Sequence, residues 1–401
     1  MTDVFAPRHP CPACQSVRAK TFYVIRGVPV HSVLLIDSRE EAVAYSSGDI
    51  ELTVCLDCGF IFNRAFRPEV HDYSERYDPT QGYSPTFNAF HKQLALDLIE
   101  RYDLHQRKII EIGCGQGEFL TLLCELGDNH GVGFDPAYLP VREESRSPGR
   151  THFIPDYYSV KYAGYQADFV CCKMTLEHIP DVMRFMKTVH NAIAARTDTV
   201  VFFQLPDTSR ILRDVAFWDI YYEHCSYFTL GSLARLFRRA GFTILDLWRA
   251  YDDQYLMLVA RPNAAPIKQS THTEEENVGQ LTEWVEQFET QSASALARWR
   301  QVIEQFHKNE ERVVLWGGGS KAVAFLTTLG VNAQVSYVVD INPRKHGTFI
   351  AGSGQEIVSP TFLCEYRPDV VIIMNAIYRE EISNQLSEMG LHPTLITVEG
   401  S

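Results

Sequence analysis

Short apolar runs, glycine turns and helical stretches follow one another in the middle of the chain and again near its end. Residues 108–127 form a pattern of a short apolar strand, the turn GCGQG and a helix. Residues 312–330 repeat this order around the turn GGGS. Strands that alternate with helices in this way pair in parallel, so the sequence predicts two α/β domains.

Further apolar runs extend the first of these domains and close it with a hairpin. The pattern predicts strands at residues 131–136, 167–174 and 199–206. Residues 242–248 and 254–262 predict two last strands with only a short turn between them. Strands joined by a short turn pair antiparallel, so we expect one antiparallel strand in an otherwise parallel sheet.

The first part of the chain carries two CxxC pairs with forty residues between them: Cys11, Cys14, Cys55 and Cys58. Four thiolates in a tetrahedral array are the ligands that structural zinc prefers, and such a closed set leaves no open position for catalysis. Strand-like runs at residues 30–36 and 49–55 predict a zinc ribbon rather than a DNA-reading finger. Four buried cysteines of a reduced core, or a redox-active CxxC pair, are the alternatives.

These patterns divide the chain into four parts. The third part contains a long charged stretch with apolar residues at helical spacing, which predicts a helix from about Gln280 to Lys308. We predict a zinc-binding module, a first α/β domain, a linker with the long helix and a second α/β domain, over residues 1–72, 73–262, 263–310 and 311–401.

Composition narrows the class of protein. The 401 residues are 45% hydrophobic, which is enough for two α/β domains and a small module. A formal net charge of −13 opposes broad contact with a phosphate backbone, so we predict no nucleic-acid partner. The sequence has no run of about eighteen apolar residues and no basic leader before an apolar stretch, which predicts a cytoplasmic protein without a membrane partner.

The turn GCGQG has the character of a site for S-adenosylmethionine. Gly113, Gly115 and Gly117 leave no side chains between backbone and ligand, and amides at the start of a helix favour a polar ligand group. The order GxGxG after Glu111 differs from the GxGxxG of dinucleotide sites, although the turn alone fits either ligand. Asp135, at the end of the next predicted strand, offers a carboxylate to both ribose hydroxyls.

A later segment, FIPDYY, adds a carboxylate and an aromatic ring. Asp156 and Tyr157 suit the amino group and the face of adenine. The terminal hairpin is how class I methyltransferases end, and dehydrogenases lack it. Together these features predict a class I methyltransferase fold, a Rossmann-like α/β domain, with S-adenosylmethionine as its cofactor.

The chain resembles the sugar C-methyltransferases that act on nucleotide-linked 4-keto deoxysugars in antibiotic-sugar pathways. A four-cysteine module, a GCGxG core and a second Rossmann-like domain with a glycine turn carry the likeness over nearly the whole chain. Its most specific part is YYEHCSYF, which matches the family's Tyr-x-Glu-His segment. The resemblance implies that Tyr221, Glu223 and His224 lie in the active site, and His178 of TLEHIPD matches a further histidine of the family.

C-methylation beside a ketone requires a base for the carbon-bound proton and a donor for the enolate oxygen. We predict that His224 is the base, since imidazole titrates near neutral pH, and that Tyr221 is the donor. Glu223 would orient or polarise the imidazole, and His178 is an alternative base. The plainer interpretation of both segments is architectural, because LEHI occurs in methyltransferases of many specificities and residues 221–224 also suit a buried aromatic segment.

The second α/β domain supplies the predicted contacts to the acceptor. In the resembled family this domain helps to hold the nucleotide-sugar, which implies phosphate contacts from Gly317, Gly318, Ser320 and Lys321. The cations that such a ligand would need are Lys321, Arg344 and Lys345. A glycine turn that only packs a helix on a strand, and an independent NAD site, are the alternatives. Before the first domain, Tyr73, Tyr77 and Tyr83 could cover the ligand pocket or pack the module onto that domain.

Our leading hypothesis is therefore C-methylation of a ketone-bearing, nucleotide-linked deoxysugar. Three departures from the family bear on the acceptor: the segment between the two cysteine pairs, the segment YDPTQGYSPTF, and Met374-Asn375 where the family carries Trp-Asn. A second hypothesis is O-, N- or C-methylation of another small molecule. A third, of a different class, is a binding protein that kept the fold without catalysis. The sequence leaves the oligomeric state open.

Overall fold

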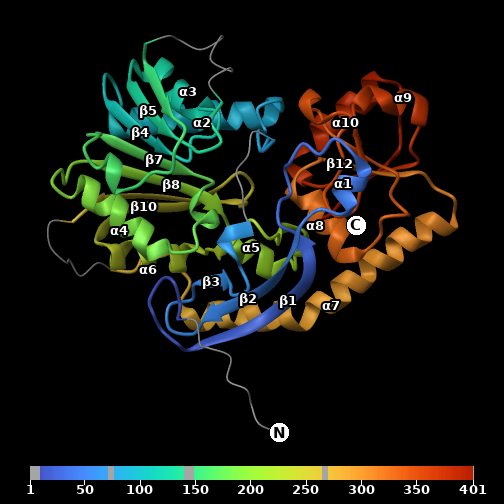
Figure 1. Cartoon of the computed structure of the whole chain (residues 1–401), viewed down its shortest axis with the longest axis horizontal. Helices are drawn as coiled ribbons and strands as arrows, with labels where there is room; N and C mark the ends of the chain where they lie inside the picture. The colour runs from blue at the N-terminus through green and yellow to red at the C-terminus, as the bar shows by residue number, and fades with distance from the viewer. Residues whose placement is uncertain (1–9, 71–75, 140–148, 264–269, 401) are drawn as a thin grey trace, which may run out of the picture.

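Three sheets organise the chain in a computed structural model that describes residues 10–70, 76–139, 149–263 and 270–400. They have four, seven and five strands, in the orders β1-β2-β3-β9, β10-β11-β8-β7-β4-β5-β6 and β14-β13-β12-β15-β16. The four-stranded sheet lies at the lower end of the molecule, beside both larger units (Figure 1). This arrangement confirms the predicted α/β class with a small N-terminal module.

The N-terminal module is an antiparallel sheet with one short helix. Its elements are β1 (Ala19–Pro29), α1 (Arg39–Val43), β2 (Ser47–Cys55) and β3 (Ile61–Asn63). A two-residue strand, β9 (Ser226–Tyr227), pairs with β3 and completes this sheet from the far side of the sequence. The predicted strand at residues 49–55 is confirmed within β2.

The predicted strand at residues 30–36 is wrong. The strand β1 ends at Pro29, and residues 30–36 belong to no strand of the sheet. The side chains of Val30, Val33 and Ile36 are nevertheless buried, because the segment packs between the chain near Tyr77 and the C-terminal domain. Hydrophobicity at these positions reports burial between units and not strand pairing.

The seven-stranded sheet confirms the predicted hairpin. Its strands are β4 (Lys108–Ile112), β5 (His130–Phe134), β6 (Thr151–Ile154), β7 (Phe169–Lys173), β8 (Val200–Pro206), β10 (Phe242–Ala250) and β11 (Tyr255–Pro262). The strand β11 runs antiparallel to both of its neighbours, and the other neighbouring strands pair in parallel. Parallel pairing brings the carboxyl ends of β4, β5, β7 and β8 to one edge, where ligands of such folds bind.

Helices cover both faces of this sheet. They are α2 (Pro85–Tyr102), α3 (Glu118–Gly127), α4 (Val182–Ile193) and α6 (Leu230–Ala240), whereas α5 (Thr208–Arg213) follows β8 and packs with the core of the N-terminal module. Alternate residues of β7 point to opposite faces, so that Val170 and Cys172 join the core under α4 and α6, whereas Phe169 and Cys171 join the core under α2 and α3. Burial on both faces accounts for the uninterrupted apolar run that identified this strand.

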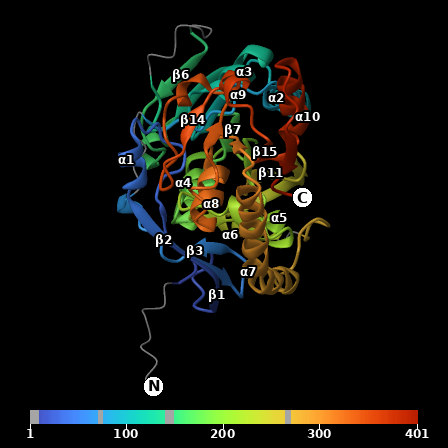
Figure 2. The ribbon, with the colours of Figure 1, turned by 90° about the vertical axis from the view of Figure 1, so that its right-hand side faces the viewer.

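The C-terminal unit begins with the long helix α7 (Val278–Lys308) and continues as a parallel sheet. Its other elements are β12 (Val313–Trp316), α8 (Ser320–Leu329), β13 (Tyr337–Val339), β14 (Glu356–Val358), α9 (Leu363–Tyr366), β15 (Val370–Ile373), α10 (Arg379–Glu388) and β16 (Thr394–Thr397). The helix α7 confirms the prediction at Gln280–Lys308. It packs against α5, β1 and α8, and therefore connects the three units along one side of the molecule (Figure 2). Throughout the described residues, helices are too short or too polar to span a bilayer.

Candidate active site

One large cavity lies where the seven-stranded sheet, the C-terminal domain and the N-terminal segments meet. Its volume is about 1200 Å³, and its lining includes the turn GCGQG, the segments after β7 and β8, and the start of α8. A pocket for one small ligand usually has about 300–1000 Å³. The cavity is therefore large enough for two ligands side by side.

The first glycine turn packs closely against the segment after β7 and is fixed by a carboxylate. Gly113 has a φ of 70°, and a Cβ at this position would meet Thr175 Oγ1 at 1.9 Å, so no other residue fits. The carboxylate of Asp135 accepts the amides of Gly115 and Ala137, each at 2.8 Å, and burial raises its pKa to about 6. The predicted glycines and Asp135 thus lie together at the end of β4 and β5.

Behind this turn lie a buried glutamate and a buried lysine, of which sequence analysis identified only the glutamate. Burial raises the pKa of Glu111 to about 8, although the positive charge of Lys173 opposes the shift. Burial also lowers the pKa of Lys173 to about 8; its ammonium donates to His91 Nε2 at 2.9 Å and lies over the Phe119 ring. A lysine at the end of the apolar strand β7 was the signal that could have identified this residue.

The predicted adenine contacts lie at the mouth of the cavity. Asp156 accepts hydrogen bonds from the Tyr162 hydroxyl at 2.5 Å and from Lys161 at 2.9 Å, and these two groups lower its pKa. The Tyr157 side chain is 58% exposed, and both predicted residues line the cavity. Tyr83 also lines the mouth and is 44% exposed, whereas Tyr73 lies outside the described residues.

Two histidines and a tyrosine come together on the other side of the cavity. His178 ends the short 3-10 helix η4 (Leu176–His178). The centroid of its ring lies 4.9 Å from the centroid of the His224 ring, and the two ring planes make an angle of 80°. The Tyr221 ring lies 4.2 Å from the His224 ring. Burial raises the pKa of Tyr221, so its phenol keeps the proton that a hydrogen-bond donor needs.

Hydrogen bonding fixes the tautomer of His178. Its Nδ1 lies 3.0 Å from the main-chain oxygen of Glu223, and a carbonyl can only accept. The proton is therefore on Nδ1, and Nε2 carries the lone pair. Burial lowers the pKa of His178, which keeps the imidazole neutral and able to take a proton at Nε2.

Glu177 is a buried carboxyl that the sequence analysis did not select. Its side chain is 2% exposed, and both carboxyl oxygens are without a hydrogen-bond partner among the described residues. Burial raises its pKa to about 8, so it is largely protonated at pH 7. Three atoms that could bind a metal ion, one each from Glu177, His178 and His224, lie within 4.8 Å of one another.

The second glycine turn repeats the geometry of the first. Asp340 follows β13 and accepts the amides of Gly318 at 2.9 Å and Asn342 at 2.8 Å. Lys345, in the 3-10 helix η6 (Pro343–Lys345), fills the remaining space: its ammonium lies 3.1 Å from both the Asp340 carboxylate and the Gly318 carbonyl. The predicted residue Gly318 therefore bonds to its own domain.

The other predicted acceptor contacts of this domain line the cavity and have partners. Lys321 lies 3.2 Å from Asp219, at the end of the 3-10 helix η5 (Phe217–Asp219), and burial lowers its pKa. Arg210 of α5 also pairs with Asp219. Arg344 pairs with the buried Asp78 at 3.2 Å. The cavity thus presents cations from both large units, held by carboxylates at their junction.

The four cysteines form one cluster away from the cavity. The sulfurs lie within 4.8 Å of one another, with 3.7 Å between Cys11 and Cys58 and 3.6 Å between Cys14 and Cys55. A regular tetrahedron with metal–sulfur bonds of about 2.3 Å has edges of about 3.8 Å. The donor set and its spacing therefore fit a metal ion with four sulfur ligands.

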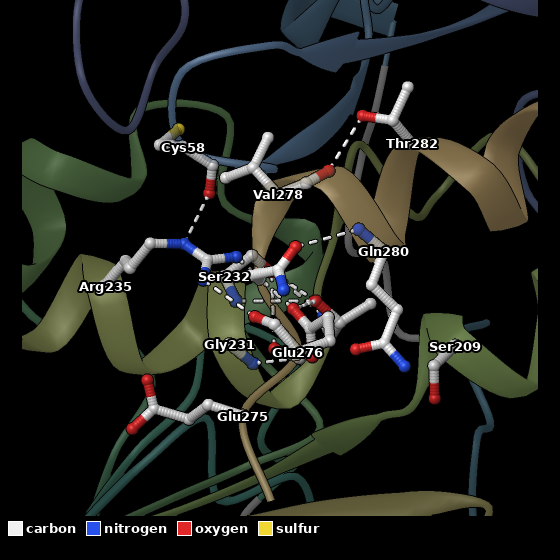
Figure 3. A network of polar contacts seen from close by, with 12 residues as sticks. Cys58, Ser209, Gly231, Ser232, Arg235, Glu275, Glu276, Val278, Gln280 and Thr282 are labelled. Carbon is white, nitrogen blue, oxygen red and sulfur yellow. Dashed lines mark hydrogen bonds and ion pairs between the residues drawn. The ribbon is translucent and has the colours of Figure 1, made fainter. Parts of the chain in front are cut away.

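A buried ionic network anchors this cluster to the rest of the molecule (Figure 3). Arg235 of α6 donates to the Cys58 carbonyl at 2.8 Å and pairs with Glu276 at 3.3 Å. Glu276 precedes α7 and accepts the Gly231 amide at 2.9 Å. The position of the cysteine loop is thereby fixed against both α6 and the start of α7.

Comparisons with known proteins find methyltransferase relatives over most of the chain. The family model described as "Methyltransferase domain" matches residues 87–247, and the family model described as "C-methyltransferase C-terminal domain" matches residues 256–394. The chain is 25% identical over 405 residues to the C-methyltransferase NovU of Streptomyces niveus. That match covers 97% of this chain and 94% of the relative.

Solved methyltransferase structures resemble part of the chain at low identity. The 1,6-didemethyltoxoflavin-N1-methyltransferase of Burkholderia thailandensis is 18% identical, with coverage of 45% of this chain and 82% of that one and a TM-score of 0.36. The magnesium protoporphyrin IX methyltransferase of Synechocystis PCC 6803 is 14% identical, with coverage of 44% and 84% and a TM-score of 0.34. Likenesses of this degree carry no argument about the acceptor.

Proposed function

Because this chain is an S-adenosylmethionine-dependent C-methyltransferase, we propose that it methylates a carbon atom beside a ketone of a nucleotide-linked deoxysugar, through an enolate. One observation carries the proposal. The first glycine turn, the pair His178 and His224, and the start of α8 all line the same cavity. The proposed donor site, the proposed acid–base pair and a cationic end of the C-terminal domain therefore face one space.

The glycine turn and the strand ends would hold the donor. Gly115, where an added Cβ would meet nothing within 4 Å, leaves room for the methionine part, and the Asp135 carboxylate suits the ribose hydroxyls. Asp156 and Tyr157 at the cavity mouth suit the adenine. Bound S-adenosylmethionine supplies an electrophilic methyl group, and all further chemistry falls to the side chains of this chain.

The acid–base step would use the aromatic segment before β9. His224 accepts the proton from the carbon beside the ketone, and the electron pair of that C–H bond moves onto the ketone oxygen. The protonated phenol of Tyr221 donates a hydrogen bond to this oxygen as its charge develops. His178, whose Nε2 carries a lone pair, is the alternative base.

The acceptor's nucleotide would lie toward the C-terminal domain. Lys321 at the start of α8 and Arg344 in η6 provide positive charge for a diphosphate, and Ser320 provides a hydroxyl. Lys345 is the fourth polar group of this end, but its ammonium already neutralises Asp340. We therefore expect phosphate contacts from α8 and η6 and no ribose contact from Asp340.

The four-cysteine cluster would hold a structural zinc ion. Its closed set of four sulfurs has no position for a substrate, and the network around Glu276 fixes it to α6 and α7. Metal analysis of the purified protein should give one zinc per chain. Replacing Cys55 with serine should lower that content and the melting temperature.

Mass spectrometry with candidate acceptors tests the proposed reaction. Thymidine- and guanosine-diphosphate keto-deoxysugars are incubated with the protein and the donor, and the methylated position is located by fragmentation. We expect a new carbon–carbon bond beside the ketone. A methyl group on oxygen or nitrogen would favour another small-molecule methyltransferase, and absence of donor binding by calorimetry would favour a binding protein.

A substitution of the base tests its assignment. His224→Asn should lower kcat by about a hundredfold and leave the Kd of the donor nearly unchanged, because the step lost is proton removal. His178→Asn is the matched variant, and the larger loss identifies the base. The exposed His130 at the start of β5 provides the control, since His130→Asn should retain full turnover.

A further inference from the structure

A segment of the N-terminal module reaches the candidate active site. After β1 ends, residues 30–33 are buried, and backbone hydrogen bonds hold the segment from two sides. The Asp78 amide donates to the Val33 carbonyl at 2.9 Å, and the Phe349 amide of the C-terminal domain donates to the Ile36 carbonyl at 2.9 Å. The segment is therefore fixed at the junction of all three units.

Donors from this segment hold the carboxylate of Glu223. His31 Nδ1 lies 3.2 Å from Oε1, and the Ser32 amide donates to Oε2 at 3.1 Å. The Ser32 hydroxyl bonds to the same oxygen and lies 2.7 Å from the hydroxyl of Ser320 in α8. Glu223 is 2% exposed, so these donors replace the water that would otherwise stabilise its charge.

We propose that His31 and Ser32 are positioning residues for the acid–base pair, through Glu223. The same residue that they hold by its side chain accepts His178 Nδ1 with its main-chain oxygen. One fixed residue thus determines the position of a negative charge and the tautomer of an imidazole. The N-terminal module, beyond its metal cluster, contributes two residues to the organisation of the active site. This inference rests on the proposed function for its kinetic consequences.

The charges around Glu223 give the arrangement a signature in the pH profile. The titratable groups that interact electrostatically with it include His31, His178 and Tyr221. Burial raises the pKa of Glu223, but His31, Ser32 and His178 together more than offset this, with the hydrogen bond from His31 as the largest contribution, and the pKa lies below the usual range. Loss of the His31 donor should therefore raise the pKa and move the acid limb of kcat/KM to higher pH.

A double-mutant cycle tests the role. His31→Leu should lower kcat about tenfold with little change in KM, and Ser32→Ala should lower it less. His31→Asn keeps a donor near the Nδ1 position and should restore most of the rate. In the Glu223→Gln background, His31→Leu should cost less than about twofold, because the group on which it acts has changed. An unchanged pH profile for His31→Leu, or equal losses in both backgrounds, overturns the proposal.

A measurement without acceptor separates this proposal from the proposed reaction. In protein labelled with ¹⁵N-histidine, Glu223→Gln should shift the His31 Nδ1 resonance and leave that of the exposed His130 in place. An unshifted His31 signal overturns the positioning role, whatever the turnover. If the wild-type protein methylates no keto-sugar although the His31 signal shifts, the proposed reaction fails and the positioning role stands. Ser32→Ala provides the same test should His31→Leu fail to fold.

Discussion

The two glycine turns of this chain use one device in two different ways. In each, a carboxylate at the end of the second strand accepts two backbone amides, one of them from the turn. Asp135 of the first turn has no ion-pair partner among the described residues, whereas Asp340 of the second is paired with Lys345. The first carboxylate is therefore available to a ligand, and the second is neutralised from within its own domain.

This difference explains how two similar sheets can divide one cavity. A carboxylate without a cation suits hydroxyl donors such as those of a ribose, and this favours the donor at the first turn. At the second turn the carboxylate is already paired, and the groups that suit a ligand are the cations of α8 and η6, whose charge favours phosphate. Similar glycine turns thus need separate interpretation, and the group that pairs with the strand-end acid decides between them.

The largest expected effect comes from exchanging the two carboxylates for amides. Asp135→Asn should weaken binding of S-adenosylmethionine by about tenfold to a hundredfold, since a hydrogen bond to a charged group contributes about 1.5–3 kcal/mol. Asp340→Asn should leave the Kd of the donor unchanged. Isothermal calorimetry measures both, and equal losses for the two variants would break the comparison.

The pH dependence of donor binding sharpens the same contrast. The pKa of Asp135 is raised to about 6, and only the ionised form accepts both ribose hydroxyls. Affinity should therefore be constant above about pH 7 and fall as the pH drops through 6, to about a tenth at pH 5. Calorimetry across this range should give a flat profile for Asp135→Asn and the wild-type profile for Asp340→Asn.

The cations of the second unit should affect the acceptor alone. Lys321→Met should raise the KM of a nucleotide-linked acceptor by about tenfold, because it removes a charge-assisted contact to phosphate, and should leave the Kd of the donor unchanged. Lys308→Met, at the exposed end of α7, provides the control. A loss of donor affinity in Lys321→Met would contradict the division of the cavity.

The smallest expected effect concerns the buried carboxyl between the two turns. Glu177 has its pKa raised to about 8, so its ionisation destabilises the fold increasingly as the pH rises from about 4.5 toward 8. Glu177→Gln removes this cost, and its stability advantage over wild type should grow by about 1.3 kcal/mol between pH 6 and pH 7. Urea unfolding measures the difference, and a pH-independent difference would contradict the assignment.

Sequence patterns predicted those elements of the fold whose structure is determined by residues close to one another in the sequence. The strand and turn at residues 108–117, the final hairpin and the helix α7 each depend on neighbouring residues, and each is confirmed. The predicted strand at residues 30–36 is wrong, because the apolar residues of this segment are buried by other units and not by pairing in a sheet. A lysine such as Lys345 gives no sign in the sequence that it neutralises Asp340.

The candidate site was harder to predict where it joins distant segments. Motifs identified Tyr221, Glu223 and His224, but His31 and Glu223 lie 192 positions apart, and nothing in either segment points to the other. The histidine in the apolar run VHSVLLI was the available signal. A polar residue in a buried run requires a partner, although the sequence does not say which.

Solvent hydrogen exchange at the acceptor tests the central claim most directly. A nucleotide-linked keto-deoxysugar is incubated with the protein and S-adenosylhomocysteine in D₂O, so that proton removal can occur without methyl transfer, and ¹H NMR follows each carbon-bound proton. We predict deuterium at one carbon beside the ketone, at a rate that falls about a hundredfold in His224→Asn or, if His178 is the base, in His178→Asn. No exchange at any carbon, together with a methyl group on oxygen or nitrogen when the donor is present, would contradict an enolate mechanism.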